Sequence, residues 1–159
     1  MKKIDNSEIS TLLLAAGKGA RLGTLTKNLP KCLMPINERP ILEYWLDMLH
    51  SLNIKYVLVN LHHHSEKVIK FLRRERFKNW VKSVYEKELL GTAGTIRKNY
   101  NFFRNKKLLL IHVDNFCLSN FNEFVSFHLE KRPMECPITM MTFQTNEPEN
   151  CGIVKQYFA

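Results

Sequence analysis

Residues 9–21 read Ile9-Ser-Thr-Leu-Leu-Leu-Ala-Ala-Gly17-Lys-Gly19-Ala-Arg21, an apolar run that passes directly into two glycines and a basic residue. The apolar part, 9–15, has the length and composition of a buried strand. Glycines after such a strand admit positive φ angles and close approach of a ligand, so that unpaired N–H groups can converge on phosphate oxygens. Arg21 and, further on, Lys31 add positive charge, since Arg holds a phosphate bidentately and Lys acts as a mobile point charge. The stretch therefore predicts a strand followed by a phosphate-binding loop.

The rest of the chain alternates between strand-like and helix-like segments. A helix begins at Pro40, because apolar residues recur at helical spacing from Ile41 to Leu49. Such alternation predicts an α/β sandwich with a mostly parallel sheet, whose ligands bind at the carboxyl ends of the strands. The further strand patterns lie at 56–61, 81–85, 108–113 and 138–143, and the further helical patterns at 66–76, 95–100 and 121–129.

Length and composition indicate a single folded domain. A chain of 159 residues suits one domain spanning 1–159, and its hydrophobic content of 45% and aromatic content of 11% exclude an intrinsically disordered protein. No apolar run reaches the ~18–20 residues of a membrane span, so no membrane association is expected. Because Asp5 and Glu8 precede an apolar run that ends in a glycine loop, we also expect no signal peptide.

Cysteine and charge patterns limit the compartment and the partners. Scattered cysteines without a CxxC pair predict reduced, mostly buried thiols in a cytoplasmic protein; they are Cys32, Cys117, Cys136 and Cys151. The net charge of +9 leaves two interpretations open, a solvated basic surface or a site for a polyanionic partner. No RNA-binding pattern and no zinc-finger spacing occur, so no nucleic acid is expected as a partner. The excess charge is concentrated in one amphipathic segment, at Lys67, Lys70, Arg73, Arg74, Arg76, Lys78 and Lys82.

The glycine loop matches neither of the two commonest phosphate loops. A Walker A loop requires GxxxxGK[ST], but here Gly23 is followed by Thr24, so the lysine is absent. A dinucleotide-binding loop requires GxGxxG, and Leu22 occupies the position of its third glycine. Taken alone, the pair Gly17 and Gly19 is also compatible with an ordinary β-turn.

A longer stretch resembles a known family. Residues 12–49, LLLAAGKGARLGTLTKNLPKCLMPINERPILEYWLDML, closely resemble the N-terminal signature L-A-[AG]-G-x-G-[ST]-R-L-x-P-L-T-x-x-x-P-K-x-L-x-P-[IV] of the sugar-1-phosphate nucleotidylyltransferases, including those that act on mannose 1-phosphate with GTP. The resemblance implies a three-layer α/β/α sandwich with a Rossmann-like sheet. It also implies that the nucleotide is bound by Ala15, Ala16, Gly17 and Gly19.

Two basic residues of this signature carry the implied catalytic roles. Arg21 would hold the β- and γ-phosphates that leave, and Lys31 would stabilise charge at the α-phosphorus. Two positions depart from the family, since Ala20 replaces Ser or Thr and Thr24 replaces Pro. The first removes a hydroxyl and the second loosens the loop, because Pro would fix φ. Neither removes the Arg or the Lys, so we expect reduced rather than lost phosphate binding.

A second motif, Tyr85-Glu-Lys-Glu-Leu-Leu-Gly91-Thr-Ala-Gly94-Thr, has two interpretations. From the residues alone it is a strand leading through a glycine turn into a helix, with Thr92 or Thr95 as the N-cap. By its resemblance to the family's L-G-T-[AG] segment, Gly91 and Thr92 would contact the base and ribose. Glu86 falls where the family reads the base edge. Its carboxylate could accept from the N1–H and amino group of guanine, which favours GTP, with UTP as the alternative.

Two further motifs concern the metal and the sugar. Asp114 follows the apolar strand 108–113, at the end where α/β ligands bind, and a carboxylate together with substrate phosphates is how proteins usually hold Mg²⁺. The resemblance implies that Asp114 is a Mg²⁺ ligand, whereas the residues alone also allow a turn or helix-capping Asp. Gly152, in Asn150-Cys-Gly-Ile-Val, resembles the glycine that lets the sugar approach the backbone. The run His62-His63-His64 is assigned to a loop after the strand 56–61 rather than to a zinc site, because neighbouring side chains on a strand point to opposite faces.

Together the motifs imply transfer of a nucleoside monophosphate from an NTP to a sugar 1-phosphate, with Mg²⁺ as cofactor. In the family, a Glu–Lys pair and a second metal-binding Asp follow the Gly152 segment, and this sequence ends at Ala159. We therefore expect a domain that is incomplete at its C-terminus. The alternatives are a non-catalytic nucleotide-binding or regulatory module of the same fold, and a basic nucleic-acid-binding domain. The sequence leaves the sugar and the oligomeric state open.

Overall fold

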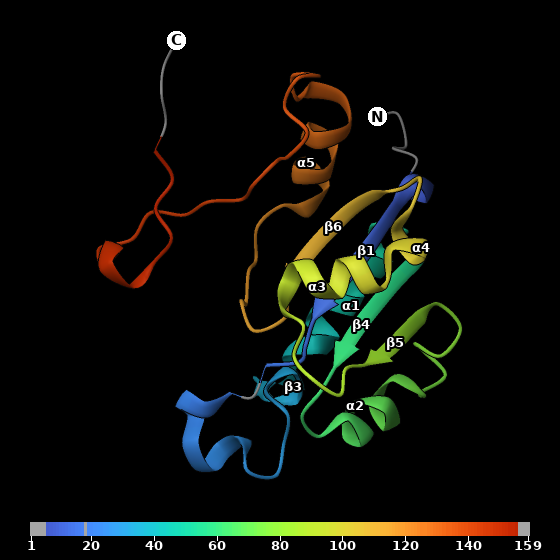
Figure 1. Cartoon of the computed structure of the whole chain (residues 1–159), viewed down its shortest axis with the longest axis vertical. Coiled ribbons are helices and arrows are strands. Elements are labelled where there is room, and N and C mark those ends of the chain that lie inside the picture. The colour runs from blue at the N-terminus through green and yellow to red at the C-terminus, as the bar shows by residue number, and fades with distance from the viewer. Residues whose placement is uncertain (1–5, 18, 156–159) are drawn as a thin grey trace. The chain divides into compact units, whose positions relative to one another are not determined.

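The computed structural model describes residues 6–17 and 19–155, with the side chains of Ala20 and Arg21 outside the description. The chain forms two compact units, Met1–Ser119 and Asn120–Ala159, which are considered separately (Figure 1). The sequence predicts one domain over 1–159, and that organisation stays a prediction.

The first unit is built on a parallel four-stranded sheet. Its strands are β1 (Ile9–Leu14), β4 (Tyr56–Leu61), β5 (Val81–Tyr85) and β6 (Lys107–His112), in the order β5-β4-β1-β6. β1 pairs in parallel with both β4 and β6, so that Leu12 lies beside Leu58 on one side and Leu110 on the other. The four strands predicted in this unit are confirmed to within one residue at each end. Because β1 is central and covered on both faces, its sequence is a continuous buried run and does not alternate.

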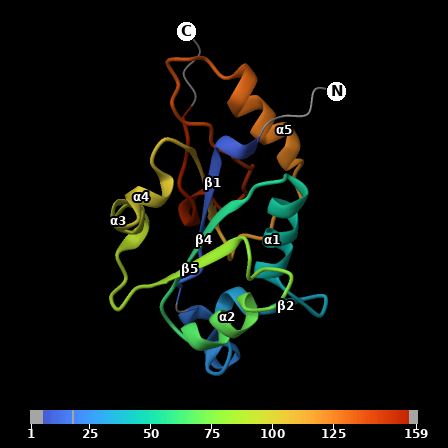
Figure 2. The same cartoon turned by 90° about the vertical axis from the view of Figure 1, so that its right-hand side faces the viewer.

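Helices cover both faces of this sheet. Figure 2 shows α3 (Gly91–Lys98) and α4 (Tyr100–Phe103) on one side of the strands and α1 (Ile41–Ser51) on the other. α2 (Ser65–Leu72) packs against β5. The α1 side buries Leu42, Leu46 and Leu49 completely, and the other side buries a cluster of Leu12, Leu58 and Phe103. The predicted three-layer α/β/α sandwich with a Rossmann-like parallel sheet is therefore confirmed.

Two helix boundaries differ from the predicted ones. The helix expected over 66–76 ends at Leu72, because the chain turns to bring the buried Phe77 onto Phe71, with ring centroids 5.3 Å apart. The helix expected over 95–100 begins earlier, at Gly91, and a second short helix, α4, follows it. Both differences are set by tertiary packing, which periodicity alone does not reveal.

A short hairpin precedes α1 and was not predicted. Strands β2 (Pro35–Ile36) and β3 (Arg39–Pro40) pair antiparallel across Asn37 and Glu38, whose φ angles are 48° and 64°. Two residues with positive φ suit the tight two-residue turn that matches the twist of a hairpin. The 3₁₀ turns η2 (Ala20–Thr26) and η3 (Lys31–Leu33) lead from β1 into this hairpin.

The second unit contains helical structure and no strand among its described residues. α5 (Phe121–Ser126) is capped by the Asn120 side chain, which accepts from the Glu123 N–H at 3.2 Å. A π-helical turn, η4 (Phe127–Lys131), continues it, and a 3₁₀ turn, η5 (Pro148–Asn150), follows later. The strand predicted over 138–143 is wrong. Its apolar side chains are exposed and its backbone finds no neighbouring strand in the described part of the chain, and a strand exists only when paired.

The cysteines differ from prediction in their burial. All four carry thiols, but only Cys32 is buried, whereas Cys117 is half-buried and Cys136 and Cys151 are exposed. The expectation of mostly buried thiols is therefore wrong, because the last two lie on irregular backbone of the second unit. No helix in the described parts of the chain has both the length and the apolar character that crossing a membrane requires.

Candidate functional site

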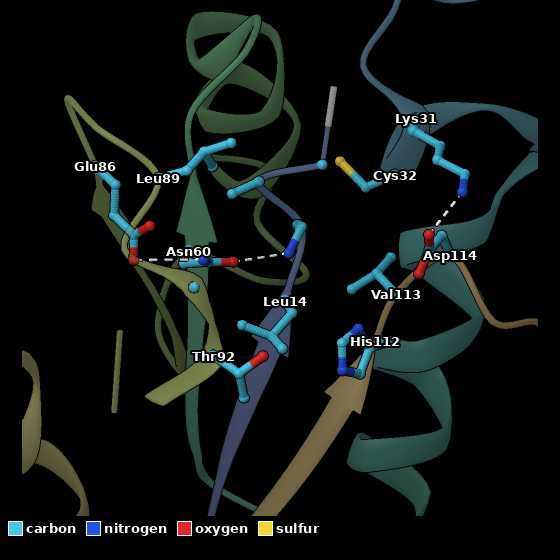
Figure 3. Close-up of a pocket in the computed structure, with 14 residues that line it drawn as sticks. Leu14, Lys31, Cys32, Asn60, Glu86, Leu89, Thr92, His112, Val113 and Asp114 are labelled. Atoms are coloured by element: carbon cyan, nitrogen blue, oxygen red, sulfur yellow. Dashed lines mark hydrogen bonds and ion pairs between the residues drawn. The ribbon is translucent and has the colours of Figure 1, made fainter. Parts of the chain in front are cut away.

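A pocket of about 220 Å³ opens at the carboxyl ends of the four parallel strands (Figure 3). The chain runs from β1 outward to β4 and β5, and then crosses back to β6 on the other side of β1. This reversal of direction leaves a crevice beside β1, which is where ligands bind in open α/β sheets. The pocket is lined by Leu14, Ala15, Ala16, Gly17, Lys31, Cys32, Asn60, Glu86, Leu89, Gly91, Thr92, His112, Val113 and Asp114.

The predicted phosphate loop lies at the mouth of β1. Gly17 lines the pocket, and a Cβ placed there would meet nothing within 4 Å, so the backbone is open to a ligand. Gly19 does not line the pocket and has a structural role. Its φ is +65°, and an added Cβ would lie 2.8 Å from Cγ2 of Thr26, whose hydroxyl donates to the Gly19 carbonyl at 3.1 Å. Of the two glycines, Gly19 thus uses the positive φ that glycine admits, whereas Gly17 does not. The side chain of Arg21 lies outside the described residues.

Lys31 and Asp114 meet at one end of the pocket, although 83 residues separate them. Lys31 Nζ lies 2.6 Å from Asp114 Oδ2, and the two side chains are 27% and 39% exposed. Asp114 follows β6, whose end is fixed because Val113 N–H donates to the Leu14 carbonyl at 3.2 Å. The Trp45 indole of α1 donates to the Val113 carbonyl at 3.0 Å. The sheet and α1 thus fix the segment that carries Asp114, and the two charges predicted for phosphate and metal lie side by side.

Glu86 lies at the opposite end, directly after β5, and is 1% exposed. Its backbone continues the sheet, since the Glu86 N–H donates to the Leu61 carbonyl at 2.8 Å. Carboxylate oxygen Oε1 accepts from the Thr95 hydroxyl at 2.5 Å and from the Asn60 amide at 3.4 Å. From the described residues, Oε2 accepts one long bond, from the Leu90 N–H at 3.5 Å. Among the described side chains no cation pairs with this carboxylate, which is unusual because a buried charge is costly without a counter-ion.

The glycine-threonine turn closes the pocket beside Glu86. Gly91 has φ +68°, and both it and Thr92 line the pocket as predicted. The alternative prediction of a threonine N-cap is wrong, because Leu90 occupies the N-cap of α3 and no side chain caps that helix. Thr95 lies in the interior of α3, fully buried. Its hydroxyl points toward Glu86 and donates to the carboxylate oxygen Oε1 at 2.5 Å.

Asn60 is the functional candidate that the sequence reasoning missed. It is the second-last residue of β4, lines the pocket and is buried, and its Oδ1 accepts from the Ala15 N–H at 2.8 Å. One of the loop N–H groups expected to be available for phosphate is therefore already occupied. The signal was present in the sequence, because Asn60 is a polar residue near the end of the apolar run 56–61, as Asp114 is at the end of another.

The remaining lining residues are mostly apolar and were also missed. Leu14, Leu89 and Val113 form walls, and His112 lies at the end of β6. Cys32 is 2% exposed, and burial raises the pKa of its thiol from 9.0 to about 12. The thiol is therefore protonated at neutral pH and serves as an apolar wall, since the thiolate is the reactive form.

The histidine run occupies the loop after β4, as predicted. His62 Nδ1 lies 2.8 Å from the Glu86 carbonyl and His64 Nε2 lies 3.1 Å from the Lys27 carbonyl, so these two side chains brace different loops. The His63 ring lies beside that of His64, with centroids 3.9 Å apart. Gly152, predicted to approach the sugar, lies exposed in the second unit and is not placed relative to the pocket.

Comparisons with known proteins agree on one family. A family model described as Nucleotidyl transferase matches residues 10–157. A protein of Campylobacter jejuni subsp. jejuni serotype O:2 named D-glycero-alpha-D-manno-heptose 1-phosphate guanylyltransferase is 29% identical over 147 residues, covering 92% of this chain and 62% of that protein. A protein of Synechocystis sp. named UTP–glucose-1-phosphate uridylyltransferase is 27% identical over 143 residues, covering 82% of this chain and 37% of that protein.

Solved structures share the fold. The crystal structure of HddC from Yersinia pseudotuberculosis complexed with GMP-PN matches with a TM-score of 0.65 and 23% identity, over 76% of this chain and 54% of that one. The present chain thus spans less than two thirds of the length of the relatives that it matches.

Proposed function

Because the chain belongs to the nucleotidyl transferase family, we propose that it transfers a nucleoside monophosphate from an NTP to a sugar 1-phosphate, giving an NDP-sugar and pyrophosphate. GTP is the favoured donor and UTP the alternative. The observation that supports this most strongly is the convergence of three motifs, distant in sequence, on one pocket. Lys31, Glu86 and Asp114 come from three separate loops and line the same cavity.

The distribution of charge in the pocket suggests how the nucleotide lies. The buried acceptor Glu86 and the polar Thr92 are at one end, and the Lys31–Asp114 pair is at the other (Figure 3). The open backbone of Gly17 lines the same pocket. A base has N–H donors at its edge and the triphosphate is anionic. We therefore orient the base toward Glu86 and the phosphates toward Gly17 and Lys31, with the ribose against the wall between them.

The preference for guanine rests on the Glu86 carboxylate. It is an acceptor without a cation among the described side chains, and its Oε2 has only one long bond from the protein. Guanine presents two adjacent donors, N1–H and the 2-amino group, whereas uracil presents one. A charged acceptor strengthens each hydrogen bond about twofold relative to a neutral one. The curated relatives include both a guanylyltransferase and a uridylyltransferase by name, which is why UTP remains the alternative.

The chemistry asks the protein mainly to position charges. An oxygen of the sugar 1-phosphate attacks the α-phosphorus in line, the bond from that phosphorus to the bridging oxygen breaks, and pyrophosphate leaves. Lys31 would neutralise charge that develops at the α-phosphate, and Arg21 would hold the leaving β- and γ-phosphates. Positioning and charge neutralisation supply most of the rate in phosphoryl-transfer chemistry.

Asp114 fits a Mg²⁺ ion that arrives together with the nucleotide. The described residues hold no group of three or more His, Cys, Asp or Glu side chains that could retain a metal by themselves. Mg²⁺ in such sites is instead held by one or two carboxylates, substrate phosphates and water. When bound, the ion would neutralise phosphate charge and orient the attack. Asp114 would hold it on the phosphate side of the pocket.

One observation favours a second candidate function. The segment that carries Gly152, proposed to approach the sugar, is exposed and irregular in the second unit, whereas all the lining residues of the pocket belong to the first. A polypeptide of this kind could act as a non-catalytic nucleotide-binding or regulatory module. The two functions share nucleotide binding and differ in turnover.

A thermal-shift panel tests the shared step first. GTP, UTP, CTP, ATP and dTTP are each added with and without Mg²⁺ to the wild type, to Asp114→Ala and to Glu75→Ala, an exposed carboxylate outside the pocket that serves as control. A ligand at 100 times its Kd stabilises the native state by about 2.7 kcal/mol. We expect a Mg²⁺-dependent shift with GTP that is lost in Asp114→Ala and kept in Glu75→Ala.

Turnover is then measured as pyrophosphate release with a panel of sugar 1-phosphates. Release with one sugar supports the transferase, and nucleotide binding without release supports the module. Absence of a shift with every nucleotide would remove both functions for this polypeptide.

A further inference from the structure

The arrangement around Glu86 assigns a role to two residues that lie behind it. We propose that Thr95, together with Asn60, is a positioning residue that holds one oxygen of the Glu86 carboxylate and so presents only the other oxygen to the nucleobase. The inference rests on the proposed nucleotide-binding function and adds to it the residues that set base selectivity.

The first step is the asymmetry between the two oxygens of Glu86. Oε1 accepts a short bond from the Thr95 hydroxyl at 2.5 Å and a long one from the Asn60 amide at 3.4 Å. Among the described residues, Oε2 accepts one long bond, from the Leu90 N–H at 3.5 Å. Since a carboxylate oxygen accepts about two hydrogen bonds, Oε2 has the greater capacity for a ligand donor.

The second step concerns the single proton of the Thr95 hydroxyl. The hydroxyl has two acceptors within reach, Glu86 Oε1 at 2.5 Å and the Gly91 carbonyl at 2.9 Å. It can donate to only one at a time, and the shorter distance and the negative charge favour Glu86. Since Thr95 is fully buried and held in the middle of α3, it offers this proton from a fixed direction.

The third step is the connection to the phosphate side. Asn60 uses both ends of its amide, accepting from the Ala15 N–H at 2.8 Å and donating toward Glu86. Its orientation is therefore determined, because the reverse amide would place a donor against the Ala15 N–H. Asn60 thereby ties the loop that follows β1 to the carboxylate that follows β5.

The rotation about the last bond of a Glu side chain has a broad energy profile, so a carboxylate without such contacts samples many orientations. When the carboxylate is held in one orientation, its oxygen Oε2 accepts hydrogen bonds from one direction only. At ring position 1 guanine carries an N–H and adenine carries an acceptor lone pair, so an acceptor aimed at this position attracts guanine and repels adenine bound in the same pose. GTP and ATP are of similar size and carry the same triphosphate, so their affinity ratio isolates this effect.

The test compares Thr95→Val, which keeps the size of the side chain and removes the hydroxyl, with Thr95→Ser, which keeps the hydroxyl. Binding of GTP and ATP is measured by calorimetry with Mg²⁺, and the melting temperature without nucleotide checks the fold. We expect the GTP-to-ATP affinity ratio to fall at least about tenfold in Thr95→Val and to change less than about threefold in Thr95→Ser, because a hydrogen bond to a charged group has this weight. Thr95→Ala gives the same comparison if Thr95→Val is poorly folded.

The outcomes separate this inference from the proposed function. A wild type that prefers GTP, with an equal loss of both affinities in Thr95→Val, would give Thr95 a structural role only and overturn the inference while the function stands. A wild type that binds both nucleotides equally would overturn it as well. A wild type that binds neither would remove the proposed function and the inference with it.

Discussion

The two ends of the pocket are built in opposite ways. The base end is buried and hydrogen-bonded within the protein, with Glu86 1% exposed and held by Thr95 and Asn60. The phosphate end is open, and its two charges satisfy each other in one exposed ion pair between Lys31 and Asp114. The base end is thus organised before any ligand arrives, whereas the phosphate end has to exchange its internal pair for contacts with the ligand.

The difference follows from what each end recognises. A base edge is a small pattern of donors and acceptors, so its reader must have a fixed direction, which burial and hydrogen bonds supply. A triphosphate is a large charge, so its reader needs charge and mobility more than direction. An exposed ion pair contributes about 0–1 kcal/mol to stability, so opening it costs little. Under the proposed function, the first end would determine selectivity and the second would support the reaction, and each prediction below tests that separation.

The largest expected effect is on the phosphate end, in Lys31→Met. Without the ammonium, charge at the α-phosphate is not neutralised, and we expect pyrophosphate release to fall about 100- to 1000-fold. The free energy of unfolding should change by no more than about 1 kcal/mol, because the ion pair is exposed. Lys27→Met, a change of an exposed lysine outside the pocket, is the control. Equal rates for the two variants would contradict the assignment.

A smaller effect is expected at the base end, in Glu86→Gln. The amide carries no negative charge and its NH2 group is a donor, so the preference for GTP over ATP should fall about 10- to 100-fold in calorimetric affinity, which corresponds to the 1.5–3 kcal/mol of a charged hydrogen bond. The free energy of unfolding should not fall much, since a neutral amide is easier to bury than a carboxylate. Glu88→Gln changes an exposed neighbour and should leave the preference intact. A preference that survives in Glu86→Gln would mean that another group reads the base.

Alkaline pH tests the wall between the two ends. The pKa of Cys32 is raised by burial to about 12 in the folded protein from 9.0, so the folded state keeps a proton that the unfolded state loses between these values. Stability from this group is complete below about pH 9 and is lost as pH rises, by about 1.4 kcal/mol per pH unit. Denaturant unfolding of wild type and Cys32→Ala at pH 8 and pH 10 should therefore converge at the higher pH. A constant difference between the two proteins would show that the thiol does not titrate with folding.

The smallest effect is the coupling energy of the exposed pair. A double-mutant cycle with Lys31→Met and Asp114→Asn should give a coupling of no more than about 1 kcal/mol in the free energy of unfolding. The same cycle with Thr95→Val and Glu86→Gln should give a larger value, because that pair is buried. If the exposed pair showed the larger coupling, the proposed contrast between the two ends would be reversed.

The alternation of strands and helices was enough to predict the sheet of the first unit. The run 56–61 became β4 with the same bounds, because burial on both faces of a parallel sheet requires a nearly continuous apolar sequence. The alternating segment 81–85 became β5 at the edge of the sheet, also with the same bounds. The resemblance to the sugar-1-phosphate nucleotidylyltransferases was confirmed at the level of the family. The segment 138–143 has the same kind of composition and formed no strand, because a strand depends on a neighbour that composition does not specify.

The sequence by itself indicated several of the residues that line the pocket. Glycines after β1, a carboxylate after β5 and another after β6 are local signals, and the lining of the pocket includes Gly17, Glu86 and Asp114. Such signals can be recognised in the sequence because each depends on one residue and its immediate chain neighbours.

Only the tertiary structure decided how these residues are used. It paired Lys31 with Asp114 across 83 residues, turned Thr95 from an expected helix cap into a donor for Glu86, and gave Asn60 its place between two loops. These roles depend on distances between groups far apart in the chain, which are fixed only when the sheet brings the ends of its strands together. The physical reason is that hydrogen bonds and ion pairs act over a few ångströms in space, whatever the separation in sequence.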